Sequence, residues 1–135
     1  MIETNSSSEV IRTDHSLGLV KAASTIALLA GAWLFVSPWI YGVYANATAW
    51  NSWIVGGMIF LFGLIRIGRP ALLVFSWLNM ALGVWAFCSP WIYNYASTDT
   101  GRFINSLCVG VIVFVFSIIS ARVSTSRLSS PTQHV

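Results

Sequence analysis

The chain has 135 residues, of which 56% are hydrophobic and only 8% are charged. Soluble domains usually carry about 25% charged residues, so a soluble fold would leave much apolar surface in water. The formal net charge is +3. Because the basic residues flank long hydrophobic blocks, they indicate membrane topology rather than a surface for nucleic acid.

Four hydrophobic blocks follow a polar, serine-rich start. Each has the roughly 17–25 residues that a helix needs to cross a bilayer. We expect transmembrane helices over residues 17–39, 51–67, 71–91 and 103–121. The predicted architecture is an all-α membrane protein built from two hairpins of two spans. Its parts are a mobile tail (1–16), a first hairpin (17–67), a second hairpin (68–121) and a second tail (122–135).

The turn between the second and third spans is short, which forces these spans to be antiparallel. Gly68 suits the C-terminus of one helix, and Pro70 suits the first turn of the next. Four spans place both tails and this turn on one side of the membrane. Six basic residues fall there, namely Arg12, Lys21, Arg66, Arg69, Arg122 and Arg127. Only Arg102 falls on the opposite side, so the positive-inside rule predicts that both tails are cytoplasmic.

An internal repeat relates the two hairpins. Residues 31–41 align with residues 83–93, and eight of the eleven positions are identical, including both copies of Ser-Pro-Trp. A slip of two residues in the loop then aligns Asn51 with Asn105. Because each unit has two spans, the two units point the same way, related by an axis along the membrane normal.

This doubled motif, once in the first helix of each two-helix unit, resembles the SPW repeat proteins of bacterial membranes. The resemblance covers roughly residues 23–120. It implies the four-span fold and a location in the bacterial inner membrane. The count of basic residues predicts that both motifs lie toward the outer face. It implies no defined activity.

The Ser-Pro-Trp motif has a structural interpretation. A proline ring leaves the carbonyl four residues earlier without its helical partner, and an unpaired carbonyl costs several kcal/mol in hydrocarbon. The neighbouring serine could satisfy it, and the tryptophan could anchor the helix at the interface. The alternative is a ligand site made by the two helix ends. The residues concerned are Ser37, Pro38, Trp39, Ser89, Pro90 and Trp91.

Aromatic residues are concentrated toward the outer side. Ten of the eleven Trp and Tyr residues lie there, and only Trp77 does not. Anchoring and packing explain most of this distribution. The alternative is an outer groove for a lipid, a quinone or another apolar ligand. Trp33 and Trp85 favour it, because they lie about two turns deeper than Trp39 and Trp91, which is below the usual interfacial level.

Small residues spaced four apart recur in both halves and allow close helix contact in lipid. We expect them inside the bundle, with an oligomer interface as the alternative. The predicted packing residues are Gly31, Ser52, Gly56, Asn79, Gly83, Ser106 and Gly110. The amide of Asn79 is expected to form an interhelical hydrogen bond, with a substrate contact as the alternative. Asn51 and Asn105 are expected to cap their helices.

Reactive chemistry is scarce in the sequence. No acidic, basic or histidine side chain lies deep inside a predicted span, where ion-coupled transporters usually place one. Cys88 and Cys108 have no cysteine counterparts in the first repeat and are expected to be buried, inert thiols. A disulfide, or a redox enzyme built on this pair, is the remote alternative. We therefore expect no catalytic residue, metal site or cofactor.

The sequence favours a small accessory or structural membrane protein. It would act by helix–helix association with a second copy or with a larger membrane complex, and its other partner would be the lipid bilayer. The alternative is a binder or passive conduit for an apolar ligand at the outer aromatic cluster.

Overall fold

The computed structural model describes the backbone of residues 2–128 and the side chains of residues 6–126. It contains four α-helices, and no strand occurs within residues 2–128. The helices are α1 (Ile2–Ile40), α2 (Ala47–Gly68), α3 (Leu73–Ile92) and α4 (Thr100–Leu128). Each is long and apolar enough to cross a membrane. The predicted all-α membrane fold of four spans is confirmed.

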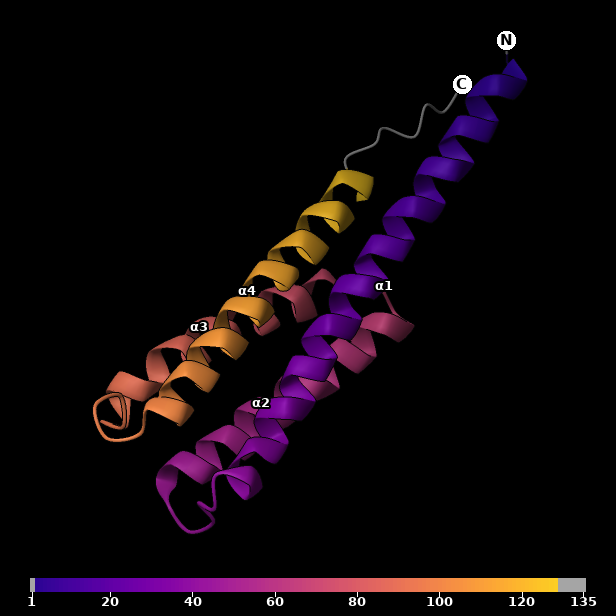
Figure 1. Ribbon diagram of the computed structural model, residues 1–135. Helices are drawn as coiled ribbons and strands as arrows, with labels where there is room; N and C mark the ends of the chain where they lie inside the picture. Colours follow the sequence, from indigo (N-terminus) through magenta and orange to yellow (C-terminus); the bar gives the residue numbers. More distant parts are fainter. Residues whose placement is uncertain (1, 129–135) are drawn as a thin grey trace.

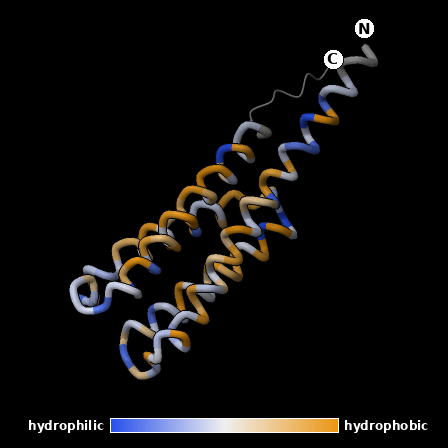
Figure 2. Tube along the Cα trace, viewed as in Figure 1, coloured by the Kyte–Doolittle hydropathy of each residue, from blue (hydrophilic) through white to orange (hydrophobic). Residues whose placement is uncertain are grey.

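The four helices form one elongated antiparallel bundle (Figure 1). The loops 41–46 and 93–99 lie together at one end, here called the Ser-Pro-Trp end. The ends of α1 and α4 that carry the chain termini lie at the opposite end, here called the terminal end, as does the turn 69–72. Figure 2 shows hydrophobic residues along the middle of the helices and hydrophilic residues toward both ends.

The outer helices extend further than predicted. The segment expected to be a mobile tail is helical from Ile2, and α4 continues to Leu128. Extending an existing helix requires no new nucleation, and no proline interrupts either extension. The rest of the second predicted tail, residues 129–135, lies outside the described residues.

The turn between the hairpins differs in one detail from the prediction. α2 ends at Gly68 as expected, but α3 begins only at Leu73, so Pro70 lies in the turn. Arg69, the residue before this proline, is extended with φ −134° and ψ 77°. Proline disfavours helical geometry in the residue before it, which separates the two helices.

Within each hairpin the two backbones approach through a pair of glycines. A Cβ atom built on Gly31 would lie 2.9 Å from the Gly56 carbonyl oxygen, and one on Gly56 would lie 2.6 Å from the Phe35 backbone nitrogen. The second hairpin repeats this contact with Gly83 and Gly110. Such close approach allows extensive van der Waals contact between helices in lipid.

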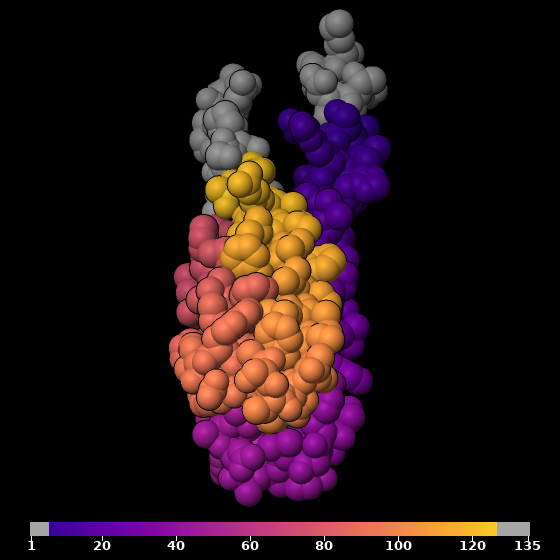
Figure 3. Space-filling model, turned by 60° about the vertical axis from the view of Figure 1, so that its left-hand side comes forward, coloured from indigo at the N-terminus to yellow at the C-terminus, as the bar shows by residue number. Residues whose placement is uncertain are grey.

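The centre of the bundle is an apolar core built symmetrically from both repeats. It consists of three pairs of equivalent positions, namely Leu34 with Ala86, Val55 with Val109, and Ile59 with Val113. α1 also packs on α4, and α2 packs less extensively on α3. Figure 3 shows one face of the molecule, on which α3 and α4 of the second hairpin pack side by side. Because both hairpins contribute residues to the apolar core, the core joins them.

Several other predicted residues are placed by this packing. Ser106 and Asn79 are buried, and Ser52 is half-buried. The predicted interhelical bond of Asn79 is not formed by its side-chain oxygen, which is buried without a hydrogen-bond partner among the described residues. Cys88 and Cys108 are free thiols, but the prediction that both are buried is wrong: Cys88 is half-buried, and Cys108 is exposed on the surface of α4.

Candidate functional site

The serine of each Ser-Pro-Trp motif satisfies a backbone group that the helix leaves unpaired. The Ser37 hydroxyl donates to the Leu34 carbonyl (2.8 Å), and the Ser89 hydroxyl donates to the Ala86 carbonyl (2.9 Å). These are the carbonyls that the two prolines free. Each helix ends two residues after its proline, at Ile40 or Ile92. The motif therefore ends the helix without leaving a buried carbonyl unpaired.

In the second repeat a tyrosine extends this hydrogen bonding. The Tyr95 hydroxyl lies 3.2 Å from Ser89 Oγ and 2.9 Å from Ser106 Oγ. Because the single hydrogen of Ser89 goes to the Ala86 carbonyl, Tyr95 must donate to Ser89 and accept from Ser106. All three residues are buried. This network connects the end of α3 to the start of α4.

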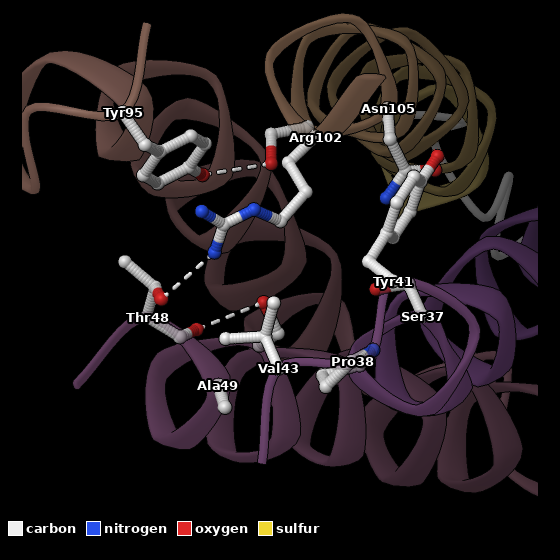
Figure 4. Close-up of a pocket in the computed structure, with 11 residues that line it drawn as sticks. Ser37, Pro38, Tyr41, Val43, Thr48, Ala49, Tyr95, Arg102 and Asn105 are labelled. Atoms are coloured by element: carbon white, nitrogen blue, oxygen red, sulfur yellow. Dashed lines mark hydrogen bonds between the residues drawn. The ribbon is translucent and has the colours of Figure 1, made fainter. Parts of the chain in front are cut away.

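A small cavity lies beside this network at the Ser-Pro-Trp end (Figure 4). Its volume is about 20 Å³, and its walls come from α1, α2, α4 and the two loops. The lining residues are Ser37, Pro38, Tyr41, Val43, Thr48, Ala49, Ser52, Tyr95, Arg102, Asn105 and Ser106. Most of these side chains are polar, which distinguishes the cavity from the apolar core below it.

Arg102 spans one side of the cavity. Its guanidinium donates to Asp99 (2.6 Å) and to the Thr48 hydroxyl (3.0 Å), and it lies 5.0 Å from the centre of the Tyr95 ring. The Arg102 backbone N–H also donates to the Asp99 carboxylate (3.1 Å). This backbone hydrogen bond is the main reason that the pKa of Asp99 lies below its ordinary value. The Arg102 charge is thus already paired.

Two tryptophan–asparagine hydrogen bonds join the repeats to each other. The Trp33 indole donates to Asn105 Oδ1 (2.6 Å), and the Trp85 indole donates to Asn51 Oδ1 (2.8 Å). The prediction that these asparagines cap their helices is wrong, because α2 and α4 begin several residues earlier. They act instead as acceptors, one turn inside the helix, for the opposite repeat.

These two bonds predict a measurable coupling between the hairpins. In a double-mutant cycle, Trp33→Phe and Asn105→Leu should show a coupling of roughly 0.6–1.7 kcal/mol, the range found for hydrogen bonds between membrane helices. Thermal unfolding in detergent would measure it. Pairing Asn105→Leu with Trp77→Phe on the outside of the bundle is the control. Equal coupling energies in both cycles would contradict the hydrogen bond between Trp33 and Asn105.

The tryptophans predicted to form an apolar ligand site lie on the outside of the bundle. Trp33, Trp39, Trp85 and Trp91 are 50%, 48%, 42% and 54% exposed. None of these four tryptophans is among the described residues that line the cavity. The structure therefore brings Ser37 and Pro38 to the cavity and leaves the four tryptophans half-exposed on the outside of the bundle.

The largest aromatic cluster on this surface belongs to the first hairpin. Trp39 packs against Trp53 in a tilted arrangement with ring centroids 5.2 Å apart, and Trp50 meets Trp53 edge to face at 5.4 Å. In the second hairpin, Trp91 packs only against Phe87 and Phe103 among the ring contacts of the described residues. The two halves thus differ in their aromatic surface.

The terminal end contains a polar cluster that the sequence-based expectations do not include. Arg66, in the last turn of α2, is 1% exposed. Its guanidinium donates to Ser76 Oγ (2.8 Å), Ser124 Oγ (2.7 Å) and Ser120 Oγ (3.1 Å). It also donates to the carbonyls of Ser120 and Pro70. This one side chain joins α2 to α3, α4 and the connecting turn.

The spacing of small and apolar residues along α2 could have predicted that Arg66 is buried. Gly56, Ile59, Gly63 and Arg66 recur at intervals of three and four, which places them on one helix face. All four are buried. The charge of Arg66 alone suggests that it lies in a solvated turn. Its place on the same helix face as Gly56, Ile59 and Gly63 predicts instead that it faces the interior of the bundle.

Comparison with known proteins agrees with the repeat architecture. A family profile described as the SPW repeat domain matches residues 21–120. No curated protein and no solved structure matches the chain. The matched stretch covers most of the chain and includes both Ser-Pro-Trp motifs, both glycine crossings and both tryptophan–asparagine bonds. The chain therefore belongs to the SPW repeat domain family.

Proposed function

We propose that this chain is a structural or accessory component of the bacterial inner membrane. It acts through its outer surface, by helix–helix association with a second copy or with a larger membrane complex. It performs no catalysis of its own. Large apolar side chains such as Leu29, Leu61 and Val74 are exposed on this outer surface, where they can contact lipid or another helix.

The observation that carries the proposal is the closed interior. Polar clusters occupy the two ends of the bundle, one around Tyr95 and one around Arg66. Within each cluster the side chains hydrogen-bond to one another. Between them lies the apolar core of Leu34, Val55 and their neighbours. Such an interior favours neither transport through the bundle nor chemistry inside it. The surface left for function is the apolar outside of the helices.

The proposed orientation places both termini in the cytoplasm and the Ser-Pro-Trp end outside. The terminal end carries Arg12, Lys21, Arg66, Arg69 and Arg122 in the described residues, while the other end carries Arg102. Basic residues next to spans favour the cytoplasmic side. Arg102 is in addition paired with Asp99.

A second candidate is a surface site for a lipid or a quinone. The aromatic cluster of Trp39, Trp50 and Trp53 favours it, because these rings offer a wide apolar contact at the Ser-Pro-Trp end. This candidate places the ligand against the outside of the first hairpin rather than in a path through the bundle.

Native mass spectrometry of gently extracted protein separates the two functions. We expect a second copy or partner subunits to accompany the chain, and unchanged assemblies when Trp39 is replaced by Leu. A lipid or quinone at fixed stoichiometry, lost in Trp39→Leu but kept in the control Trp77→Leu, would instead support the surface site. A bare monomer without partner or ligand would contradict both.

A further inference from the structure

The two hairpins differ at one position of the Ser-Pro-Trp end, and the backbone shows that the positions are equivalent. The Val43 N–H donates to the Pro38 carbonyl (2.9 Å), and the Tyr95 N–H donates to the Pro90 carbonyl (3.1 Å). The preceding residues, Gly42 and Asn94, both have positive φ, at 66° and 56°. Val43 therefore stands where the second repeat has Tyr95.

The consequence is an asymmetry in hydrogen bonding. In the second repeat the Tyr95 hydroxyl bridges Ser89 and Ser106. The equivalent serines of the first repeat are Ser37 and Ser52, and a valine side chain offers them no hydroxyl. Ser37 and Ser52 both line the small cavity, as does Val43 itself.

We infer that this cavity is a binding site for one water molecule, which takes the bridging role that the Tyr95 hydroxyl has in the second repeat. The cavity volume of about 20 Å³ fits one water, which needs about 10–15 Å³ of such space. A buried water also needs two to four polar partners, and the lining serines provide them.

The hydrogen-bond inventory of the site is consistent with a water. Ser37 uses its only hydrogen on the Leu34 carbonyl, so its oxygen can accept from a bound donor. Ser52 donates to the Thr48 carbonyl at 3.1 Å, and the same hydroxyl can turn toward the cavity. A water can donate to one serine and accept from the other, which is the pattern of Tyr95.

Size and charge argue against other ligands. The cavity is too small for a lipid group or a quinone ring. An anion would need a free positive charge, and Arg102 is already paired with Asp99 at 2.6 Å. A cation would need a carboxylate ligand, and the lining residues include none.

The decisive variant transfers the residue of the second repeat into the first. Val43→Tyr should place a hydroxyl between Ser37 and Ser52, while Val43→Phe adds the same ring without it. We expect the full-length Val43→Tyr protein to melt about 3–5 °C above Val43→Phe in the same detergent, as expected for one or two buried hydrogen bonds. A high-resolution map of the wild type should show a peak within hydrogen-bond distance of Ser37 Oγ and Ser52 Oγ.

Equal melting temperatures for the two variants would overturn the inference, because the hydroxyl would then have no partner. If neither variant folds, the wild-type map decides alone. A peak between the two serines supports the water site, and a map that resolves both serines without such a peak contradicts it.

Discussion

Gly56→Ala is expected to destabilise the folded bundle by about 3 kcal/mol, since its new Cβ would press on backbone atoms that cannot move independently. A Cβ here would lie 2.6 Å from the Phe35 nitrogen and 2.8 Å from the Gly31 carbonyl oxygen. Because the contact is repeated, Gly110→Ala should have a similar effect. A loss of this size lowers the folding equilibrium constant by roughly 100-fold.

The matched control for the glycine variants is Gly18→Ala on α1. A Cβ on Gly18 would meet nothing within 4 Å, and alanine favours helix over glycine by about 1 kcal/mol. Thermal unfolding in one detergent should therefore show a large loss for Gly56→Ala and none for Gly18→Ala. Similar melting temperatures for both variants would disprove the close helix crossing.

Arg66→Met is expected to destabilise the protein by about 3 kcal/mol, the second of the large effects. Hydrogen bonds to a charged group contribute about 1.5–3 kcal/mol each, and buried oxygens that lose their charged donor add a penalty. The change removes the donors to Ser76, Ser120 and Ser124. Helices α2, α3 and α4 would then separate more easily at the terminal end.

A compensating variant tests the physical reason. Replacing both sides of a buried polar contact with apolar groups can be nearly neutral, so adding Ser76→Ala and Ser120→Ala to Arg66→Met should recover much of the loss. Arg69→Ala, at an exposed arginine three residues away, is the control and should change stability by less than about 0.5 kcal/mol. Equal effects at Arg66 and Arg69 would show that burial of Arg66 is not important.

The spans and the repeat could be predicted from the sequence because their signals are local. Hydrophobic length indicates a helix that crosses lipid, and identity at a fixed offset indicates a doubled unit. Helix ends are predicted less accurately. Polarity at residues 1–16 suggests mobility, but a helix that already exists extends through polar residues that lack a proline. Asn51 resembles a cap for a similar reason, because its helix begins earlier than the hydrophobic block.

The contacts between repeats could not be predicted, because they depend on how the hairpins are placed against each other. The Trp33–Asn105 bond joins residues 72 positions apart, and no local pattern pairs them. The depth of Trp33 suggests a ligand site, whereas its indole donates a hydrogen bond to Asn105 of the other hairpin. The difference between Val43 and Tyr95 is visible in the sequence. Its effect on hydrogen bonding could not be predicted, because it depends on the two serines that the fold brings to the Tyr95 hydroxyl.

Single cysteines test most directly whether the chain is a closed bundle that crosses the membrane with its Ser-Pro-Trp end outside. The background replaces the native thiols by the first-repeat residues, as Cys88→Val and Cys108→Ile. With an impermeant maleimide, Thr98→Cys should react in intact cells, Ser126→Cys only after lysis, and the buried Ser117→Cys under neither condition. Reaction of Ser126→Cys in intact cells with Thr98→Cys protected would contradict the orientation, and reaction of Ser117→Cys would contradict the closed interior.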